Sequence, residues 1–183
     1  MKIKLPSLVA ATLALTNLPT FAATYSFAGD TTFLPLFNRA TVDGTVLSDV
    51  GTAVHYFTQD FAVSQTGAYS LSAVAGDPAN FDTFVHLYSA FNPSSPLTGF
   101  VAGNDDAFAS ADLGSAINGI TLVAGNNYSF VITGFGNTDL GAFTASIVGP
   151  GSIAPVPEPS IYALMAVGMA GLFLARHRSV AKA

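Results

Sequence analysis

Turn-forming residues interrupt the middle of the chain at intervals of about 8–12 residues, the spacing typical of β-sandwiches. Turns are predicted at Gly76-Asp77-Pro78, Asn92-Pro93-Ser94, Gly103-Asn104-Asp105, Gly125-Asn126-Asn127 and Gly134-Phe135-Gly136-Asn137. Between them lie short runs rich in Val, Ile, Phe, Tyr and Thr. These runs predict nine strands, near residues 24–28, 32–37, 53–63, 67–75, 82–89, 97–102, 115–123, 127–134 and 140–148.

Side chains alternate along two of these runs with the period of a half-buried strand. Residues 69, 71 and 73 are apolar and alternate with serines, so we expect Tyr69, Leu71 and Ala73 to face the core. The same pattern places Phe143, Ala145 and Ile147 inside. The fold class predicted is therefore all-β, an antiparallel β-sandwich of jelly-roll type.

The N-terminal end has the three parts of a secretory signal peptide. Lys2 and Lys4 precede a short apolar stretch, and the stretch closes on the small residues Thr20 and Ala22. We expect cleavage after Ala22, so residues 1–22 would not belong to the fold. The alternative is a retained membrane anchor.

The C-terminal end is a second apolar segment with a basic flank. The uncharged run from Ile161 to Ala175 follows Ser160, a helix N-cap residue, and precedes Arg176 and Arg178. A helix over 161–175 reaches only about 22 Å at about 1.5 Å per residue, against a hydrocarbon core of about 30 Å. It still spans if the arginines snorkel and the bilayer thins. We expect a single transmembrane helix, with the basic tail in the cytoplasm.

These C-terminal residues carry a family resemblance. The order Val156-Pro157-Glu158-Pro159-Ser160, apolar helix and Arg-rich tail resembles the PEP-CTERM sorting signal of Gram-negative bacteria. The resemblance implies processing near the Pro-Glu-Pro by an exosortase, a membrane-embedded cysteine transpeptidase, after an inner-membrane intermediate. It implies a final place at the cell surface or outside the cell, among exopolysaccharide or biofilm matrix. The alternative is a plain C-terminal membrane anchor.

The two end segments leave a central domain, residues 23–153, with residues 154–183 as the sorting signal. With 50% hydrophobic and 9% charged residues in the chain, disorder is excluded. Strand and turn motifs over residues 52–149, among them Phe81-Asp82-Thr83-Phe84 and Gly103-Asn104-Asp105-Asp106, resemble the bacterial pre-peptidase C-terminal domain. That resemblance implies a non-catalytic β-sandwich module of a secreted protein.

The central domain is strongly acidic. Between residues 23 and 157 there are ten Asp and one Arg, a net charge of −9. An acidic chain lacks the basic face that nucleic-acid binding needs. Calcium requires six to eight oxygen ligands, which the loop Asn104, Asp105 and Asp106 could supply together with Asp82. Asp77, Asp112 and Asp139 are further candidates. The alternative is that these carboxylates make turns and keep the surface soluble.

Catalytic motifs are missing from the sequence. The chain has no Cys, and no Gly-x-Ser-x-Gly elbow, phosphate-binding loop or dinucleotide fingerprint. His55 and His86, with Asp60 or Asp82, are the residues on which a hydrolase or metal site would depend. Some aromatic residues fall in loops rather than strands, where exposed rings would stack on sugars; the set considered is Phe33, Phe37, Tyr56, Phe57, Phe91, Phe100, Phe108 and Phe135. The alternative is that most of these rings cap the ends of the sandwich core.

Together these observations predict a non-catalytic, exported surface or extracellular-matrix protein. It would be sorted by an exosortase, with exopolysaccharide as a candidate partner and calcium as a candidate ligand. Two alternatives remain open. One is a membrane-anchored accessory or binding module that faces the periplasm. The other is a secreted hydrolase.

Overall fold

The computed structural model describes residues 22–77, 81–107, 114–157 and Met169. All strand pairs in this part of the chain are antiparallel. The strands are β1 (Ala22–Asp30), β2 (Leu36–Phe37), β3 (Val54–Val63), β4 (Gly67–Ala75), β5 (Thr83–Tyr88), β6 (Phe100–Asn104), β7 (Ser115–Leu122), β8 (Asn127–Gly134), β9 (Ala142–Pro150) and β10 (Ile153–Pro155).

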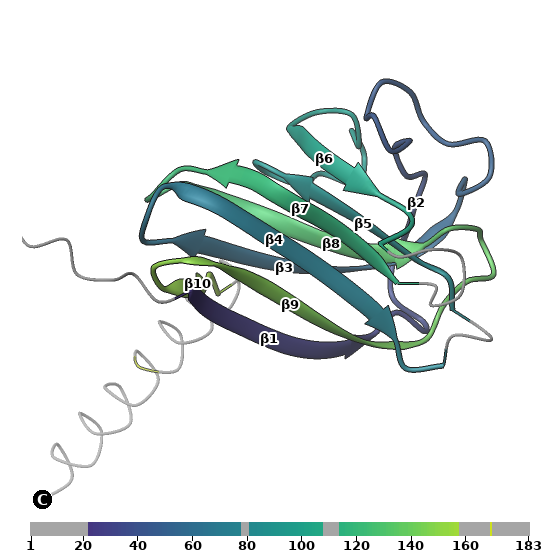
Figure 1. Cartoon of the computed structure of the whole chain (residues 1–183). Coiled ribbons are helices and arrows are strands. Elements are labelled where there is room, and N and C mark those ends of the chain that lie inside the picture. The colour runs from purple at the N-terminus through teal and green to yellow at the C-terminus, as the bar shows by residue number, and fades with distance from the viewer. Residues whose placement is uncertain (1–21, 78–80, 108–113, 158–168, 170–183) are drawn as a thin grey trace, which may run out of the picture.

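The strands form two layered sheets (Figure 1). One sheet has four strands in the order β1-β9-β4-β7. The other has the order β10-β3-β8-β5-β6, with β2 paired to β3. With the short β2 and β10 set aside, the chain crosses between sheets at every step except β5 to β6. This is the strand order of an eight-stranded jelly roll, so the predicted all-β jelly-roll sandwich is confirmed.

The core lies between the sheets, where the inward-facing residues of both meet. Tyr69, Leu71 and Ala73 of β4 are at most 1% exposed, as the alternation predicts. Phe143, Ala145 and Ile147 of β9 are buried against them. Val85 and Leu87 of β5 belong to the same cluster from the opposite sheet. Burial of this continuous apolar layer is the main stabilising term of the fold.

The outer faces of the two sheets differ. Against the six-stranded sheet lies a second cluster of Phe37, Val54, Tyr88 and Val131, covered by segments 31–53 and 89–99. Phe37 and Tyr56 pack edge to face with ring centroids 5.0 Å apart, a favourable aromatic geometry. Across the described residues, no segment packs on the outer face of the four-stranded sheet.

The predicted strand at 32–37 is wrong over most of its length, because a turn ends β1 at Asp30. The Asp30 carboxylate accepts a hydrogen bond from the Thr32 backbone N–H at 2.8 Å, and Leu34 N–H donates to the Thr31 carbonyl at 3.1 Å. Phe33 then takes a left-handed backbone, with φ of 63°. Only Leu36 and Phe37 return to a strand.

Two further features concern the chain ends. Strand β10 continues the sheet two residues past residue 153, where the sequence predicts that the central domain ends. The predicted signal peptide precedes the described residues except for Ala22, and of the predicted transmembrane helix 161–175 only Met169 is among them. Within the described ranges, no helix is long and apolar enough to cross a bilayer.

The entry and exit of the chain lie at one end of the sandwich. The first residue of β1, Ala22, pairs with Pro150, and β10 pairs with the last residues of β3, so residues 22 and 155 leave near each other (Figure 1). We call this the exit end. Strands of nine residues at about 3.4 Å each place the opposite end about 30 Å away.

Candidate functional site

Carboxylates collect at the end of the sandwich opposite the exit end. Asp30 closes β1, Asp77 follows β4, Asp82 precedes β5, Asp105 and Asp106 follow β6, and Asp139 lies between β8 and β9. We call this the acidic end. The jelly-roll order brings these loops together although they are spread over more than 100 positions of the sequence, so the predicted candidates Asp82, Asp105 and Asp106 do become neighbours.

Electrostatics at the acidic end favour a neutral or cation-bound carboxyl. Burial, followed by the negative charges of Asp106 and Asp82, raises the pKa of Asp105 to about 6. Burial also raises the pKa of Asp82, and Asp139 and Asp106 add to the effect. Arg39 opposes the shift at both residues without cancelling it. A carboxylate held in this way gains from a proton or a cation.

Two carboxylate oxygens at this end have no hydrogen-bond partner. Oδ1 of Asp82 and Oδ1 of Asp105 are both buried and unpaired. Asn104 is committed elsewhere, since its Oδ1 accepts the backbone N–H of Ala116 at 3.2 Å. Among the described residues, no group of three or more His, Cys, Asp or Glu side chains is arranged to hold a metal. Calcium therefore stays a prediction, with Asp82 and Asp105 as its most suitable protein ligands. Asp112 lies outside the described residues.

Arg39 is the feature of this end that the sequence analysis missed. Its side chain is 3% exposed, with the guanidinium 3.9 Å from the centre of the Phe84 ring and 5.3 Å from that of Phe135. It donates to the Phe135 carbonyl from Nε at 3.1 Å and from Nη2 at 2.7 Å, and to the Ala40 carbonyl from Nη1 at 3.2 Å. The available signal was that this is the only Lys or Arg between residues 23 and 157.

A cavity of about 540 Å³ opens beside Arg39, between the sheet and loop 41–50. Phe84, Phe135 and Asp105 line it from the sheet side. From the loop side, Val46 and Val50 are 56% and 46% exposed. Asp43 is occupied in the loop itself, because its carboxylate accepts the hydroxyls of Thr41 at 2.7 Å and Thr45 at 2.9 Å. Asp43 therefore acts as a turn-forming carboxylate, the alternative to cation binding that the sequence left open.

The two candidate histidines bind backbone carbonyls. His55 contacts the Leu34 carbonyl through Nδ1. His86 is fully buried on β5 and donates from Nε2 to the Ala40 carbonyl at 3.1 Å, while its ring stacks on Phe84 with centroids 4.6 Å apart. Burial lowers the pKa of His86 to about 3, so the ring is neutral at physiological pH. The contacts described for both rings hold the 31–53 segment against the sheet.

Several of the candidate aromatic residues pack inward. Phe37 of β2, Tyr56 of β3 and Phe91 of the loop after β5 form edge-to-face contacts with one another, with ring centroids 5.0 to 5.3 Å apart. Phe108 lies outside the described residues. Of the loop rings in the described residues, Phe33 is 94% and Phe135 37% exposed. Those two are the rings available for stacking on a sugar.

The sorting motif begins where the sandwich ends. Pro155 pairs with Phe61 of β3, and Val156 N–H donates to the Asp60 carbonyl at 2.9 Å. Pro157 is exposed and is the last described residue before Met169. The rest of the predicted motif, Glu158, Pro159 and Ser160, lies outside the described residues, as do Arg176 and Arg178.

Comparison with known families finds one match, to the PEP-CTERM protein-sorting motif over residues 155–179. The predicted sorting signal is therefore confirmed. No curated protein matches the chain. One solved structure that matches is the cleaved adhesin domain of Lys-gingipain from Porphyromonas gingivalis, at 12% identity and a TM-score of 0.34, over 72% of this chain and 99% of that one. A likeness of this size supports no inference about fold or ligand.

Proposed function

We propose that this chain, which carries a PEP-CTERM sorting motif, is a non-catalytic surface protein of the extracellular matrix. An exosortase cuts it at the motif and releases the sandwich to the cell surface, where it acts among exopolysaccharide or biofilm material. The observation that carries the proposal is the match over residues 155–179, which starts at the last residue of β10.

The position of the motif supports presentation to an enzyme in the membrane. Backbone pairing holds the chain through Val156, and the exposed Pro157 follows directly. Proline favours an extended conformation in the residue before it, which suits a peptide that must enter a protease cleft. The sandwich then approaches the membrane with its exit end, and its acidic end points away from the lipid.

The contents of the sandwich support a binding rather than a catalytic role. His55 and His86 contact backbone carbonyls through their ring nitrogens, and the Arg39 guanidinium is surrounded by aromatic rings and backbone carbonyls. Among the described residues, the buried polar atoms without a hydrogen-bond partner include two carboxylate oxygens at the acidic end, Oδ1 of Asp82 and Oδ1 of Asp105. Such groups accept cations or the hydroxyls of a polysaccharide.

The test is the intact mass of the protein recovered from the surface and medium of its native host. We expect a mass that begins at Ala23 and ends near Pro157–Pro159, with any group that the transpeptidase adds. A Glu158→Gln variant should accumulate uncut in the membrane, whereas Glu158→Asp tests whether the carboxylate alone suffices. A native mass that retains Ile161–Ala183 would overturn the proposal and indicate a permanent anchor.

A further inference from the structure

Strand β10 ends inside the sorting motif. It is the terminal strand of its sheet and pairs with β3 from Ile153 to Pro155 (Figure 1). The family match begins at residue 155, so Pro155 and Val156 belong both to the motif and to the contact with β3. The fold and the sorting signal therefore share these two residues.

Few hydrogen bonds hold this part of the chain to β3. At the start of β10, Ser64 N–H donates to the Ser152 carbonyl at 3.0 Å, and Ser152 N–H donates to the Ser64 hydroxyl oxygen at 2.8 Å. At its end, Val156 N–H donates to the Asp60 carbonyl at 2.9 Å. Pro155, between these contacts, has no N–H to donate. The attachment is therefore short and is interrupted by a proline.

The side chains of β10 are only partly buried. Ile153 packs against the core cluster from the edge of the sheet and is half-buried, whereas Ala154 and Pro155 are exposed. Val156 is half-buried beside a shallow hollow of about 230 Å³ that Phe91 also lines. A short terminal strand with few buried contacts opens at a lower free energy than the whole domain unfolds.

The chain between the sandwich and the apolar run is also short. Four residues, 157–160, separate Val156 from Ile161, where the uncharged run begins. Fully extended, four residues span at most about 14 Å. A single helix with its side chains is about 10–12 Å thick. While β10 stays paired, the gap between sandwich and membrane thus admits one layer of protein, and a cleft that encloses the motif needs protein on both sides.

We propose that β10 detaches from β3 during sorting and that residues 153–156 supply the length of chain that the transpeptidase needs. The inference rests on the proposed function, because it concerns the same cut. With β10 open, residues 153–160 span up to about 28 Å, which accommodates two layers of protein. After the cut, β10 pairs with β3 again and Ile153 returns to the core.

The chain has no Cys, so one introduced disulfide can lock β10 in place. Ala62 and Ala154 lie directly opposite each other on β3 and β10. Cα atoms in such pairs are about 4.5–5.5 Å apart, within the range of a disulfide. In the native host, we expect the oxidised Ala62→Cys/Ala154→Cys precursor to be cut at a rate about tenfold below that of wild type in a pulse–chase experiment, because the open form is lost. Reductant in the medium should restore the cut.

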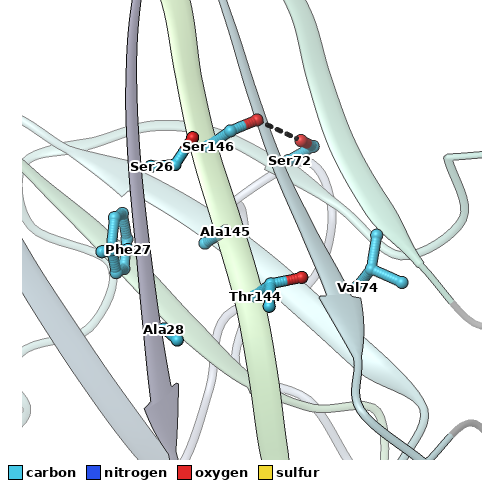
Figure 2. Close-up of a pocket in the computed structure, with 8 residues that line it drawn as sticks. All are labelled: Ser26, Phe27, Ala28, Ser72, Val74, Thr144, Ala145 and Ser146. Atoms are coloured by element: carbon cyan, nitrogen blue, oxygen red, sulfur yellow. Dashed lines mark hydrogen bonds between the residues drawn. The ribbon is translucent and has the colours of Figure 1, made fainter.

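A disulfide in the other sheet is the matched control. Ser72 of β4 and Ser146 of β9 lie opposite each other, and their hydroxyls are hydrogen-bonded at 3.0 Å (Figure 2). Oxidised Ser72→Cys/Ser146→Cys locks a strand pair that excludes β10 and should be cut like wild type. Thiol labelling verifies the oxidation of both variants, and thermal melts verify their folding.

The outcomes of this comparison separate the inference from the proposed function. If the oxidised Ala62→Cys/Ala154→Cys variant is cut as fast as the control, the inference is overturned while the proposed function stands. If wild type itself is never cut, both are overturned.

A spacer tests the length argument. A Gly/Ser insertion of about eight residues between Val156 and Pro157 has an average reach of about 16 Å, similar to the length that a locked β10 withholds. We expect this insertion to restore the cut in the oxidised Ala62→Cys/Ala154→Cys variant. An insertion that permits the cut in the unlocked chain but not in the locked one would overturn the inference.

Hydrogen exchange measures the opening without any substitution. In the full chain in detergent micelles, we expect the Val156 amide to exchange about tenfold or more faster than the Phe130 amide in the central strand β8, because β10 opens locally. Equal exchange of the two amides would show that β10 opens only when the whole domain unfolds, and would overturn the inference.

Discussion

The guanidinium of Arg39 donates two hydrogen bonds to the carbonyl oxygen of Phe135, from Nε at 3.1 Å and from Nη2 at 2.7 Å. The two residues are 96 positions apart, and their contact joins the 31–53 segment to the loop between β8 and β9. The same side chain is the nearest positive charge to Asp105 and Asp82. Arg39 therefore connects the packing of the acidic end to its electrostatics.

Replacement of Arg39 should destabilise the domain. Arg39→Met keeps much of the volume but removes the charge and the hydrogen bonds, so we expect the free energy of unfolding to fall by about 2–3 kcal/mol. Arg39→Lys keeps the charge without the planar fork and should lie between wild type and Arg39→Met. Urea denaturation measures all three. A loss for Arg39→Met below about 0.5 kcal/mol would contradict the role assigned to this side chain.

The elevated pKa of Asp105 predicts a particular dependence of stability on pH. Its folded-state pKa of about 6 lies above the ordinary value of 3.8, so the protonated form favours the fold. That stabilisation is fully present below pH 3.8 and is lost as the pH rises through 6. We expect Asp105→Asn to melt at a higher temperature than wild type at pH 8 and to lose this advantage near pH 4, in buffers containing EDTA.

Asp30→Asn provides the control of opposite sign for this prediction. Hydrogen bonds from Thr32 lower the pKa of Asp30, so its contribution is present above pH 3.8 and is lost on acidification. Asp30→Asn should therefore not gain stability at pH 8. If both variants shift the melting temperature in the same direction at pH 8, the electrostatic account of Asp105 is wrong.

Calcium binding at the acidic end is testable with the same melts. We expect calcium to raise the melting temperature relative to EDTA, because a ligand at 100 times its Kd stabilises the folded state by about 2.7 kcal/mol. An Asp82→Asn/Asp105→Asn double variant should lose this response, and magnesium should give a smaller one, since it dehydrates reluctantly. An identical midpoint with calcium and with EDTA would remove the site.

The contact between Gly149 and Tyr69 gives a prediction for the core. A Cβ at residue 149 would overlap the Tyr69 ring, which is 1% exposed. The Tyr69 hydroxyl also donates to the carbonyls of Gln65 and Pro150. We expect Gly149→Ala to cost about 1–3 kcal/mol through overpacking and Tyr69→Phe about 1 kcal/mol through the lost hydrogen bonds. Melts in which Gly149→Ala matches wild type would show that the ring has room to shift.

Some features of the fold and of the acidic end could be predicted from the sequence and others could not, for different physical reasons. The alternation around Tyr69 and Leu71 identified the core face of β4, because a half-buried strand must alternate. The apolar residues at 32–37 predicted a strand. Instead, the Asp30 carboxylate accepts a hydrogen bond from the backbone N–H of Thr32, and the chain turns there. The partners of Arg39 depend on the way the sheets stack, which no local pattern encodes. The candidates Asp82 and Asp105 do lie near each other at the acidic end, whereas the Asn104 side chain accepts a hydrogen bond from the backbone N–H of Ala116.

The separation of the exit end from the acidic end has a consequence for a population of these molecules. Molecules fixed at residue 157 would stand side by side with their carboxylates outermost, about 30 Å from the point of attachment. Their charge would lie several Debye lengths above the surface, given a length of about 8 Å at physiological ionic strength. The cells would then carry a soft anionic layer whose electrophoretic mobility depends on salt and on divalent cations more than on the lipid beneath.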